Sequence, residues 1–242
     1  MDIPKVILVL ISFIGTSTSQ NNTMVQLNGV LLEKTLIFQE PFEDLSHWTI
    51  EQMPGGEVCI SDRTLEIKDN LGCTVWYNLK IEKPFIITYN ATVIDKGGKF
   101  DRVSDLNCFW SANDPQYPDN FFAQSLKRGG KFQNYDNLKL YYVGLGGHDN
   151  TKTRFRKYKG DGTKPLLPEY DLDDRKFLIE KNISNKITII VLGNKVQYYR
   201  NEQLIFNITD NESLSSGYFG LRTVNNHMII DDFKIYKLLL QD

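Results

Sequence analysis

The sequence predicts an all-β protein, folded as a two-sheet antiparallel β-sandwich of jelly-roll type. Segments rich in β-branched and aromatic residues recur along the chain and are separated by turn residues. Only two stretches, 111–130 and 159–174, lack this pattern, and no internal repeat or interdomain linker is visible. The part of the chain that follows its N-terminal segment has about 210 residues, a length that suits one large sandwich better than two small domains. We therefore expect a single β-sandwich domain over residues 36–242.

The first strands are predicted from alternation and composition. Residues 36–42, followed by Trp48, are typical of an opening edge strand, and residues 65–68 and 73–77 alternate in polarity. Residues 84–94 form the longest β-rich run. Because that run is apolar on both faces, it predicts a strand inside a sheet that is covered on both sides.

The last strands are predicted from turns. Residues 186–192 and 195–200 flank Gly193-Asn194, which predicts a hairpin with a tight turn, and residues 204–208 extend it into a meander. Residues 217–224 and 228–236 make a closing pair of strands.

The two remaining stretches predict insertions. The first, 111–130, includes a short predicted helix near 121–127, and the second, 159–174, is rich in Pro and Asp. Long insertions between the strands of a sandwich usually line the rim of a binding face.

The N-terminus predicts export. Residues 6–14 are apolar and precede a small, polar stretch, which is typical of a secretory signal peptide over residues 1–20. The apolar run is too short to span a membrane, which takes about 20 residues, and no later segment approaches that length. We expect a secreted or periplasmic protein without a membrane span, in which residues 21–35 form a flexible leader.

Charge and cysteine content limit the partners. With 28 basic and 30 acidic residues, the net charge of −2 gives no general attraction to nucleic acid. Cys59 and Cys73 could form a disulfide in an oxidising compartment, or each could remain a free thiol, as could Cys108. Their spacing is not that of a zinc site. We expect a monomer without a metal or cofactor.

One acidic loop offers an exception to that expectation. Asp171, Asp173 and Asp174 could supply carboxylates to calcium. The loop lacks a glycine-anchored calcium-binding spacing, and short acidic loops are usually only solvated.

Arg154, Arg156 and Tyr158 occupy every second position of a predicted strand, so they share one face while Phe155 points to the other. The strand follows residues 141–150, which are rich in glycine and in hydrogen-bonding groups. Guanidinium groups bind carboxylates in bidentate fashion, and tyrosines cover sugar faces. The pattern indicates a site for an acidic, partly planar ligand such as a sugar carboxylate. The alternative is a sheet surface covered by salt bridges.

Two further strands add polar groups to that site. Alternation over 101–110 places Asp101, Asp105 and Asn107 on one face, and alternation over 217–224 turns Arg222 away from the core. If these faces belong to one sheet, a groove is expected whose residues are Asp105, Asn107, His148, Arg154, Arg156, Tyr158 and Arg222.

These residue types match the chemistry of a uronate lyase, which neutralises the carboxylate and removes the neighbouring C5 proton. Arg154, Arg156 and Asn107 would neutralise the charge. His148 or Tyr158 would be the base and Tyr142 the acid. The alternative for His148 is a loop histidine that satisfies backbone groups. His47 and His227 are weaker candidates for catalysis.

Two other chemistries use neighbouring residues. A hydrolase would pair two carboxylates about the scissile bond, such as Asp101 with Asp105 or Asp149. A binding module would use Trp110, Tyr117 and Tyr141 as sugar platforms. Aromatic residues in a sandwich are more often core residues, so Trp76 and Trp110 could serve packing alone.

Several segments carry a resemblance to a known family. Residues 42–48, 186–208, 217–222 and 232–236 resemble the concanavalin A-like lectin/glucanase superfamily. The middle segments, 101–110 and 141–158, resemble a poorly characterised secreted branch associated with polysaccharide utilisation, related to rhamnogalacturonan-degradation proteins. The resemblance covers about residues 36–236 and implies a concanavalin A-like jelly roll, a carbohydrate ligand and a concave sheet.

The catalytic motif of the glucanase branch is absent. That branch carries a Glu-X-Asp-X-X-Glu strand, whereas residues 169–173 of this chain lack the final Glu at that spacing. A retaining mechanism needs two carboxyl groups about 5 to 5.5 Å apart, so the sequence does not favour it.

The sequence therefore supports two functional hypotheses. The first is a secreted carbohydrate-active protein that acts on an acidic, uronate-containing glycan as a polysaccharide lyase or glycoside hydrolase. The second is a noncatalytic glycan-binding β-sandwich. In both, the partner is a poly- or oligosaccharide. An adhesive or structural sandwich, the third option, predicts no affinity for glycans.

Overall fold

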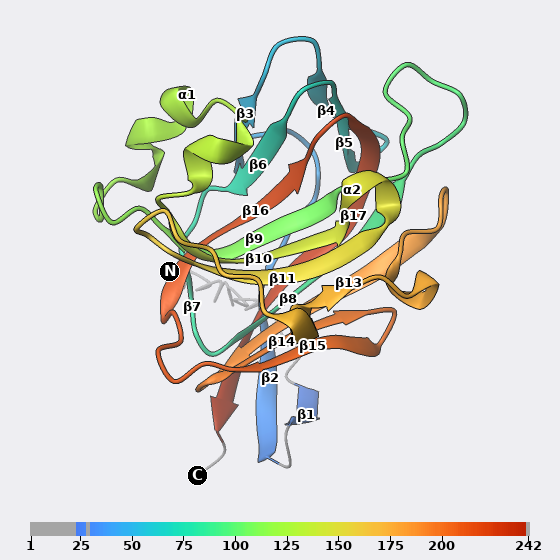
Figure 1. Cartoon of the computed structure of the whole chain (residues 1–242). Helices are drawn as coiled ribbons and strands as arrows, with labels where there is room; N and C mark the ends of the chain where they lie inside the picture. The colour runs from blue at the N-terminus through green and yellow to red at the C-terminus, as the bar shows by residue number, and fades with distance from the viewer. Residues whose placement is uncertain (1–22, 28–29, 241–242) are drawn as a thin grey trace, which may run out of the picture.

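The protein is an antiparallel β-sandwich of two large sheets (Figure 1). The computed structural model describes residues 23–27 and 30–240, so the predicted signal peptide lies outside the described residues. The nine-stranded sheet has the order β1-β2-β17-β8-β13-β14-β15, with β5 paired to β17 and β4 to β5. The eight-stranded sheet has the order β12-β11-β10-β9-β16-β6-β3, with β7 paired to β16.

The strands of the first sheet are β1 (Thr23–Leu27), β2 (Val30–Gln39), β4 (Glu57–Ser61), β5 (Thr64–Asp69), β8 (Phe85–Val93), β13 (Ser184–Leu192), β14 (Lys195–Arg200), β15 (Gln203–Thr209) and β17 (Asn226–Leu240). Those of the second are β3 (Trp48–Gln52), β6 (Cys73–Tyr77), β7 (Ile81–Glu82), β9 (Leu106–Asn113), β10 (Lys139–Gly146), β11 (Lys152–Lys159), β12 (Asp171–Leu172) and β16 (Ser216–Thr223).

Short helices occupy the connections. They are η1 (Phe121–Gln124), α1 (Ser125–Arg128), η2 (Phe132–Tyr135), α2 (Gly147–Asn150), η3 (Pro168–Tyr170) and η4 (Arg175–Phe177). The helix predicted near 121–127 is thus confirmed as η1 and α1. No described helix has both the length and the apolar content needed to cross a membrane.

The main core lies between the two sheets. Every second residue of a strand points into this core, and Trp110, Phe155 and Ile189 are examples. A second buried cluster forms on the outer face of the eight-stranded sheet, where Trp76 and Phe109 pack under the segment that contains η1, α1 and η2. Figure 1 shows this segment at one side of the sheet. The segment covers only part of that outer face.

Two strand predictions were wrong in detail. The predicted closing pair is not paired, because β16 lies in the eight-stranded sheet and β17 in the nine-stranded one. The tight turn at Val224-Asn225, with Asn225 at φ 45°, carries the chain from one sheet to the other. The central strand β8 is covered on both sides only near its start, where the outward Ile86 is buried, because its later outward residues Thr88 and Asn90 are only half-buried.

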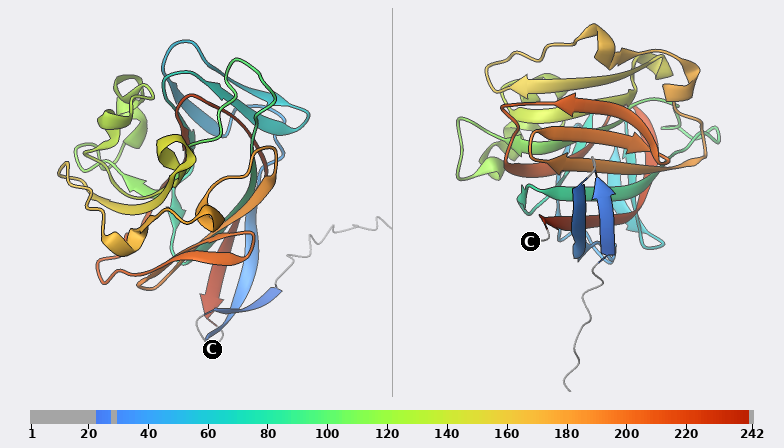
Figure 2. Two further views of the ribbon diagram at one scale, coloured as in Figure 1. Left: turned by 45° about the vertical axis from the view of Figure 1, so that its right-hand side comes forward. Right: turned by 90° about the horizontal axis from the view of Figure 1, so that it is seen from below.

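The predicted flexible leader over 21–35 is also wrong for its described residues. Strand β2 starts at Val30 and pairs with β17 from Leu32 to Gln39. Leu32 is buried against Ile86 and Leu238, and this packing favours an ordered strand. Figure 2 shows β1 and β2 beside the C-terminal end of β17. The alternative of free thiols holds for all three cysteines.

Candidate functional site

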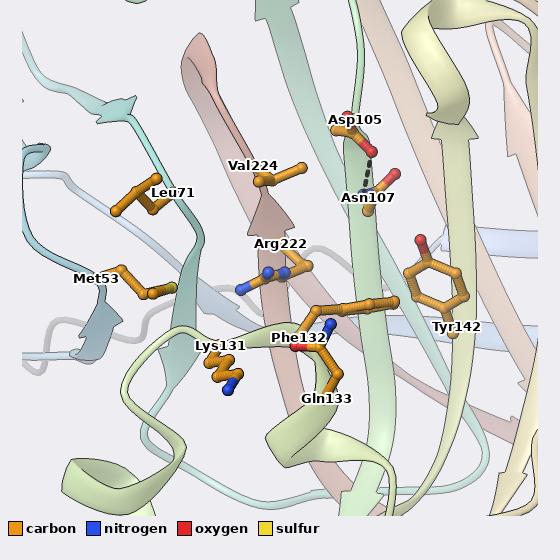
Figure 3. Close-up of a pocket in the computed structure, with 10 residues that line it drawn as sticks. All are labelled: Met53, Leu71, Asp105, Asn107, Lys131, Phe132, Gln133, Tyr142, Arg222 and Val224. Carbon is orange, nitrogen blue, oxygen red and sulfur yellow. Dashed lines mark hydrogen bonds between the residues drawn. The ribbon is translucent and has the colours of Figure 1, made fainter.

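Two adjoining pockets form one groove on the outer face of the eight-stranded sheet. They have volumes of about 320 and 380 Å³ and share Asp105, Phe132, Tyr142 and Val224. The first lobe, drawn in Figure 3, is further lined by Met53, Leu71, Asn107, Lys131, Gln133 and Arg222. The second lobe is further lined by Arg102, Gly144, Gly147, His148, Lys152, Arg154, Arg156, Tyr158 and Lys164. The groove is therefore rich in cations and has an aromatic floor.

Strand register brings the polar residues of the groove into one row. Arg222 of β16 is opposite Asn107 of β9, which is opposite Gly144 of β10, and Gly144 is opposite Arg154 of β11. The sequence prediction that Asn107, Arg154, Arg156, Tyr158 and Arg222 share one sheet face is thus confirmed. Phe155 points into the opposite, core face as predicted.

Arg154 is already neutralised by protein groups. Its Nε and Nη2 donate to the two carboxylate oxygens of Asp171 at 2.8 and 3.2 Å, and its Nη1 donates to Nε2 of His148. The hydrogen bond from Arg154 lowers the pKa of Asp171. Arg154 was predicted to neutralise a substrate carboxylate. To do so, it would have to exchange Asp171 for the ligand.

Arg156 and Arg222 differ from Arg154 because neither forms an ion pair with any described carboxylate. Arg156 donates from Nη1 to the backbone carbonyl of Lys164 at 2.5 Å. Arg222 donates from Nη1 to the carbonyl of Gly130 and to Thr74, and its guanidinium lies 5.2 Å from the ring centre of Phe132. Both arginines line the groove without a described carboxylate beside them, and Arg222 is 2% exposed.

Asp105 is held at the boundary between the lobes by three donors. Arg102 and Ser104 donate to its Oδ2 at 2.9 and 2.7 Å. Asn107 donates to its Oδ1 at 3.2 Å, which is the bond dashed in Figure 3. Asp105 has a left-handed backbone, with φ 57°. Such a conformation is uncommon for a residue other than glycine and persists where surrounding contacts enforce it. Asp105 is the only carboxylate that lines either lobe within the described residues.

The single carboxylate argues against the predicted hydrolase pairs. Asp101 precedes β9, which starts at Leu106, and its carboxylate accepts from the ring of His227 at 2.9 Å. Asp149 is exposed and binds Arg102 at 2.6 Å, on the other side of that guanidinium from Asp105. Neither lines the groove, so the expected arrangement of two carboxylates about a bond is not formed.

His148 stands at one end of the groove on a left-handed turn. His148, Asp149 and Asn150 have φ values of 53°, 57° and 57°. The Asn150 side chain holds the turn by bonds to both backbone groups of Ile179. A guanidinium can only donate, so His148 accepts at Nε2 and carries its proton on Nδ1. In this arrangement neither ring nitrogen is free to take a proton from a substrate.

Tyr142 and Tyr158 line the groove, but neither is placed as a base. Burial raises the pKa of both phenols, that of Tyr142 well above its usual range. The same burial favours the neutral form. The hydroxyl of Tyr158 has no hydrogen-bond partner in the described protein. The predicted role of Tyr158 as a base is therefore unsupported, whereas Tyr142 keeps the proton that an acid needs.

The predicted sugar platforms Trp110 and Tyr141 lie in the main core. Both are fully buried on the inner face of the sheet, where Trp110 packs against Phe155, and Tyr141 donates to Asp210 at 2.6 Å. Successive residues of a strand point to opposite faces, so Tyr142 and Phe109, the sequence neighbours of Tyr141 and Trp110, belong instead to the buried cluster on the outer face of the sheet. The exposed Tyr117 lines neither lobe.

Several groove residues were missed by sequence analysis. Arg102 was missed because a strand over 101–110 would turn it away from the face of Asp101, Asp105 and Asn107. In the structure this part is a loop, and the Arg102 guanidinium lines the second lobe. Lys131 and Phe132 directly follow the first long insertion, which was predicted to end at residue 130, and Lys164 lies in the second. The expectation that these insertions line a rim was the one signal that could have identified them.

The acidic loop considered for calcium is occupied by cations of the protein. Asp171, Asp173 and Asp174 form ion pairs with Arg154, Lys152 and Lys176, respectively. Among the described residues, no cluster of three or more acidic, His or Cys side chains has the arrangement of a metal site.

Comparison with solved structures supports the fold. A protein of unknown function with a galectin-like fold from Bacillus subtilis is 16% identical, with a TM-score of 0.67 over 85% of this chain and 97% of its own. An endo-β-1,3-glucanase from Pyrococcus furiosus is 12% identical, with a TM-score of 0.54 over 90% and 99%. The carbohydrate-binding module CBM66 from Bacillus subtilis is 13% identical, with a TM-score of 0.52 over 78% and 94%. At these identities the likeness concerns the jelly-roll fold alone.

Sequence comparison places the chain in a family. No curated protein matches the sequence significantly. The family model described as "Domain of unknown function (DUF6250)" matches residues 67–233, which include the strands that build the groove and its residues Arg156 and Arg222. The chain therefore belongs to the DUF6250 family.

Proposed function

We propose that this protein is an exported, monomeric, noncatalytic glycan-binding protein that holds an acidic saccharide in the groove of its eight-stranded sheet. The observation that carries the proposal is the pair Arg156 and Arg222, which line the groove without a carboxylate partner among the described residues. Arginine binds carboxylates strongly because its planar fork offers two parallel hydrogen bonds. A uronate-containing chain, for example a rhamnogalacturonan, would supply both the carboxylate and the hydroxyl groups.

The aromatic floor supports a sugar as the ligand. Tyr142 and Phe132 line both lobes, and their rings lie 5.7 Å apart at an angle of 51°. Ligand sites commonly combine an apolar surface of this kind with a few placed polar groups. Solved structures of the same fold include a carbohydrate-binding module and a glucanase. Binding is favoured over hydrolysis because the groove has one carboxylate.

The test is calorimetric titration of the purified mature protein with acidic and neutral polysaccharides. We expect affinity for acidic chains that falls with rising salt concentration, because added ions screen the charges. Arg156→Gln should weaken binding by about tenfold to a hundredfold, since a hydrogen bond to a charged group contributes about 1.5–3 kcal/mol. Arg63→Gln, at an exposed arginine of the β4–β5 turn, is the control and should leave affinity unchanged. Equal binding of neutral and acidic chains would refute the acidic ligand.

A second candidate is elimination at the same groove, favoured by the position of His148 beside Arg154. A ligand carboxylate that drew Arg154 away would free Nε2 of His148. His148 would then remove the C5 proton, the C4–O bond would break, and Tyr142 would protonate the leaving oxygen.

Absorbance at 235 nm and reducing ends, followed with the same substrates, distinguish the candidates. Rising absorbance would establish a lyase, and His148→Ala should then abolish turnover while affinity remains. His47→Ala, which removes an imidazole bound to Glu40 away from the groove, is the control. New reducing ends without absorbance would indicate hydrolysis, and binding without either signal would support the binding protein.

A further inference from the structure

We infer that the groove recognises two acidic sugar residues at once, one in each lobe. The inference rests on the proposed function and specifies its ligand further. It is carried by the way in which the recognition groups repeat. Each lobe contains one arginine without an acidic partner and one buried polar atom without a hydrogen bond, and a fixed carboxylate separates the two sets.

In the first lobe the set consists of Arg222 and Asn107. Asn107 is 4% exposed, and its Oδ1 has no hydrogen-bond partner within the described protein. Figure 3 shows Asn107 and Arg222 on adjacent strands of the same floor. Arg222 can bind a carboxylate while Asn107 accepts a hydroxyl proton of the same sugar. The exposed Lys131 lines this lobe and adds a second positive charge.

In the second lobe the set consists of Arg156 and Tyr158. Tyr158 is fully buried, and its hydroxyl has no partner within the described protein. A buried polar atom without a partner is costly, so such atoms in a native site need an explanation. A sugar hydroxyl beside Tyr158 would satisfy the phenol, and a carboxylate beside Arg156 would neutralise the guanidinium.

The separation of the two sets requires two sugars. Arg222 and Arg154 stand at the two ends of the row that crosses β16, β9, β10 and β11. Their backbones are therefore three strand spacings apart, or about 14 Å. Arg156 follows Arg154 by two residues on the same face. Arg222 and Arg156 also line different lobes, and the carboxylate of Asp105 lies between them, so a carboxylate bound in one lobe leaves the arginine of the other lobe without a partner.

Asp105 disfavours a negative charge in the middle of the groove. Its carboxylate lines both lobes and is fixed by Arg102, Ser104 and Asn107. An acidic group placed there would be repelled, whereas a hydroxyl could donate to it. Acidic groups are therefore directed to the two ends of the groove.

The experiment compares the affinity of three probes for the full mature chain at one salt concentration. They are galacturonic acid, digalacturonic acid, and a disaccharide of equal length with a single uronate, glucuronosyl-xylose. We expect digalacturonic acid to bind at least about tenfold more tightly than the single-acid disaccharide, because it gains one more arginine–carboxylate contact. Arg156→Gln should remove this preference, and Lys131→Gln should reduce it while leaving the fold intact. Far-ultraviolet circular dichroism and thermal melting confirm that each variant is folded.

The outcomes separate this inference from the proposed function. If digalacturonic acid and the single-acid disaccharide bind equally and Arg156→Gln weakens both, the groove binds one acid only, and the two-acid inference fails while the proposed function stands. If the polysaccharides of the first titration bind but none of the three probes does, the two-acid inference also fails. If no saccharide of any kind binds, both fail together.

Discussion

At the scale of single residues, Gly144 determines the shape of the groove floor. A Cβ atom at this position would lie 2.5 Å from the hydroxyl oxygen of Tyr142. Only glycine lets that phenol lie over the middle of the polar row between Asn107 and Arg154. The close approach therefore couples a backbone position to the surface that a ligand would contact.

We predict that Gly144→Ala shifts Tyr142 and weakens ligand binding. The added methyl group must displace the ring, and overpacking of this kind costs about 1–3 kcal/mol of stability. Urea unfolding and calorimetric titration with digalacturonic acid measure the two effects. Gly147→Ala is the matched control for stability, because its Cβ would meet no atom closer than 3.8 Å, and the free energy of unfolding should change by no more than about 0.5 kcal/mol. Equal behaviour of the two variants would contradict the role given to Gly144.

At the scale of elements, a buried ion pair joins the helical insertion to the sheet. Arg128 of α1 donates to both carboxylate oxygens of Glu51 on β3, at 2.9 and 3.2 Å, and Tyr135 of η2 donates to the same group at 2.7 Å. The side chains of Arg128 and Glu51 are 3% and 0% exposed, so removal of the Glu51 charge leaves the buried guanidinium with only the more distant carboxylate of Asp114, at 3.7 Å. This contact orients the insertion that supplies Lys131 and Phe132 to the groove.

We predict that Glu51→Gln lowers the free energy of unfolding by about 3–5 kcal/mol, the usual effect of breaking a buried pair. The same substitution at Glu43, whose pair with Arg63 is exposed, should change it by no more than about 1 kcal/mol. Chemical denaturation of the two variants tests the difference. A small effect of Glu51→Gln would mean that the aromatic cluster alone holds the insertion.

At the scale of the whole molecule, a cluster of charged groups ties the loop before β9 to the nine-stranded sheet. The ring of His227 on β17 bonds Asp101 at 2.9 Å and Glu66 on β5 at 2.8 Å. Burial opposes ionisation of Asp101. The backbone N–H groups of Lys96 and Gly98 and the His227 ring outweigh it and lower the pKa of Asp101 to about 2. The same loop carries Arg102 and Asp105 to the groove.

We predict that acid destabilises the protein partly through this cluster. Because the folded pKa of Asp101 lies below the unfolded value of about 3.9, its contribution is complete above that value and is lost as the pH falls toward 2. Urea unfolding between pH 5 and pH 2 should show a shallower loss of stability in Asp101→Asn than in the wild type. Asp119→Asn, at an exposed loop position that forms no ion pair with a described residue, should retain the wild-type slope. Parallel curves for all three proteins would exclude the contribution of Asp101.

Most strands, and the side chains that share one face of a sheet, could be predicted from local sequence patterns. The meander from β13 to β15 was predicted because its turn residues and alternation are local signals. The shared face of Arg154, Arg156 and Tyr158 followed from the period of two that any strand imposes. The same rule failed for Asp101, where a loop replaces the expected strand. Asp101 accepts hydrogen bonds from the nearby backbone N–H groups of Lys96 and Gly98 and from His227, far along the chain.

The sequence by itself determined that the protein is a β-sandwich and that Arg154, Arg156 and Arg222 lie on the sheet face opposite the main core, because these properties depend on residue alternation. Only the tertiary structure decided that Arg154 is paired with Asp171 while Arg156 and Arg222 have no acidic partner among the described residues. Likewise, it placed Trp110 and Tyr141 in the core and Arg102, Lys131 and Phe132 at the groove. The reason is physical: ion pairing and pocket shape depend on which strands and loops become neighbours, and that information is distributed over residues far apart in the chain.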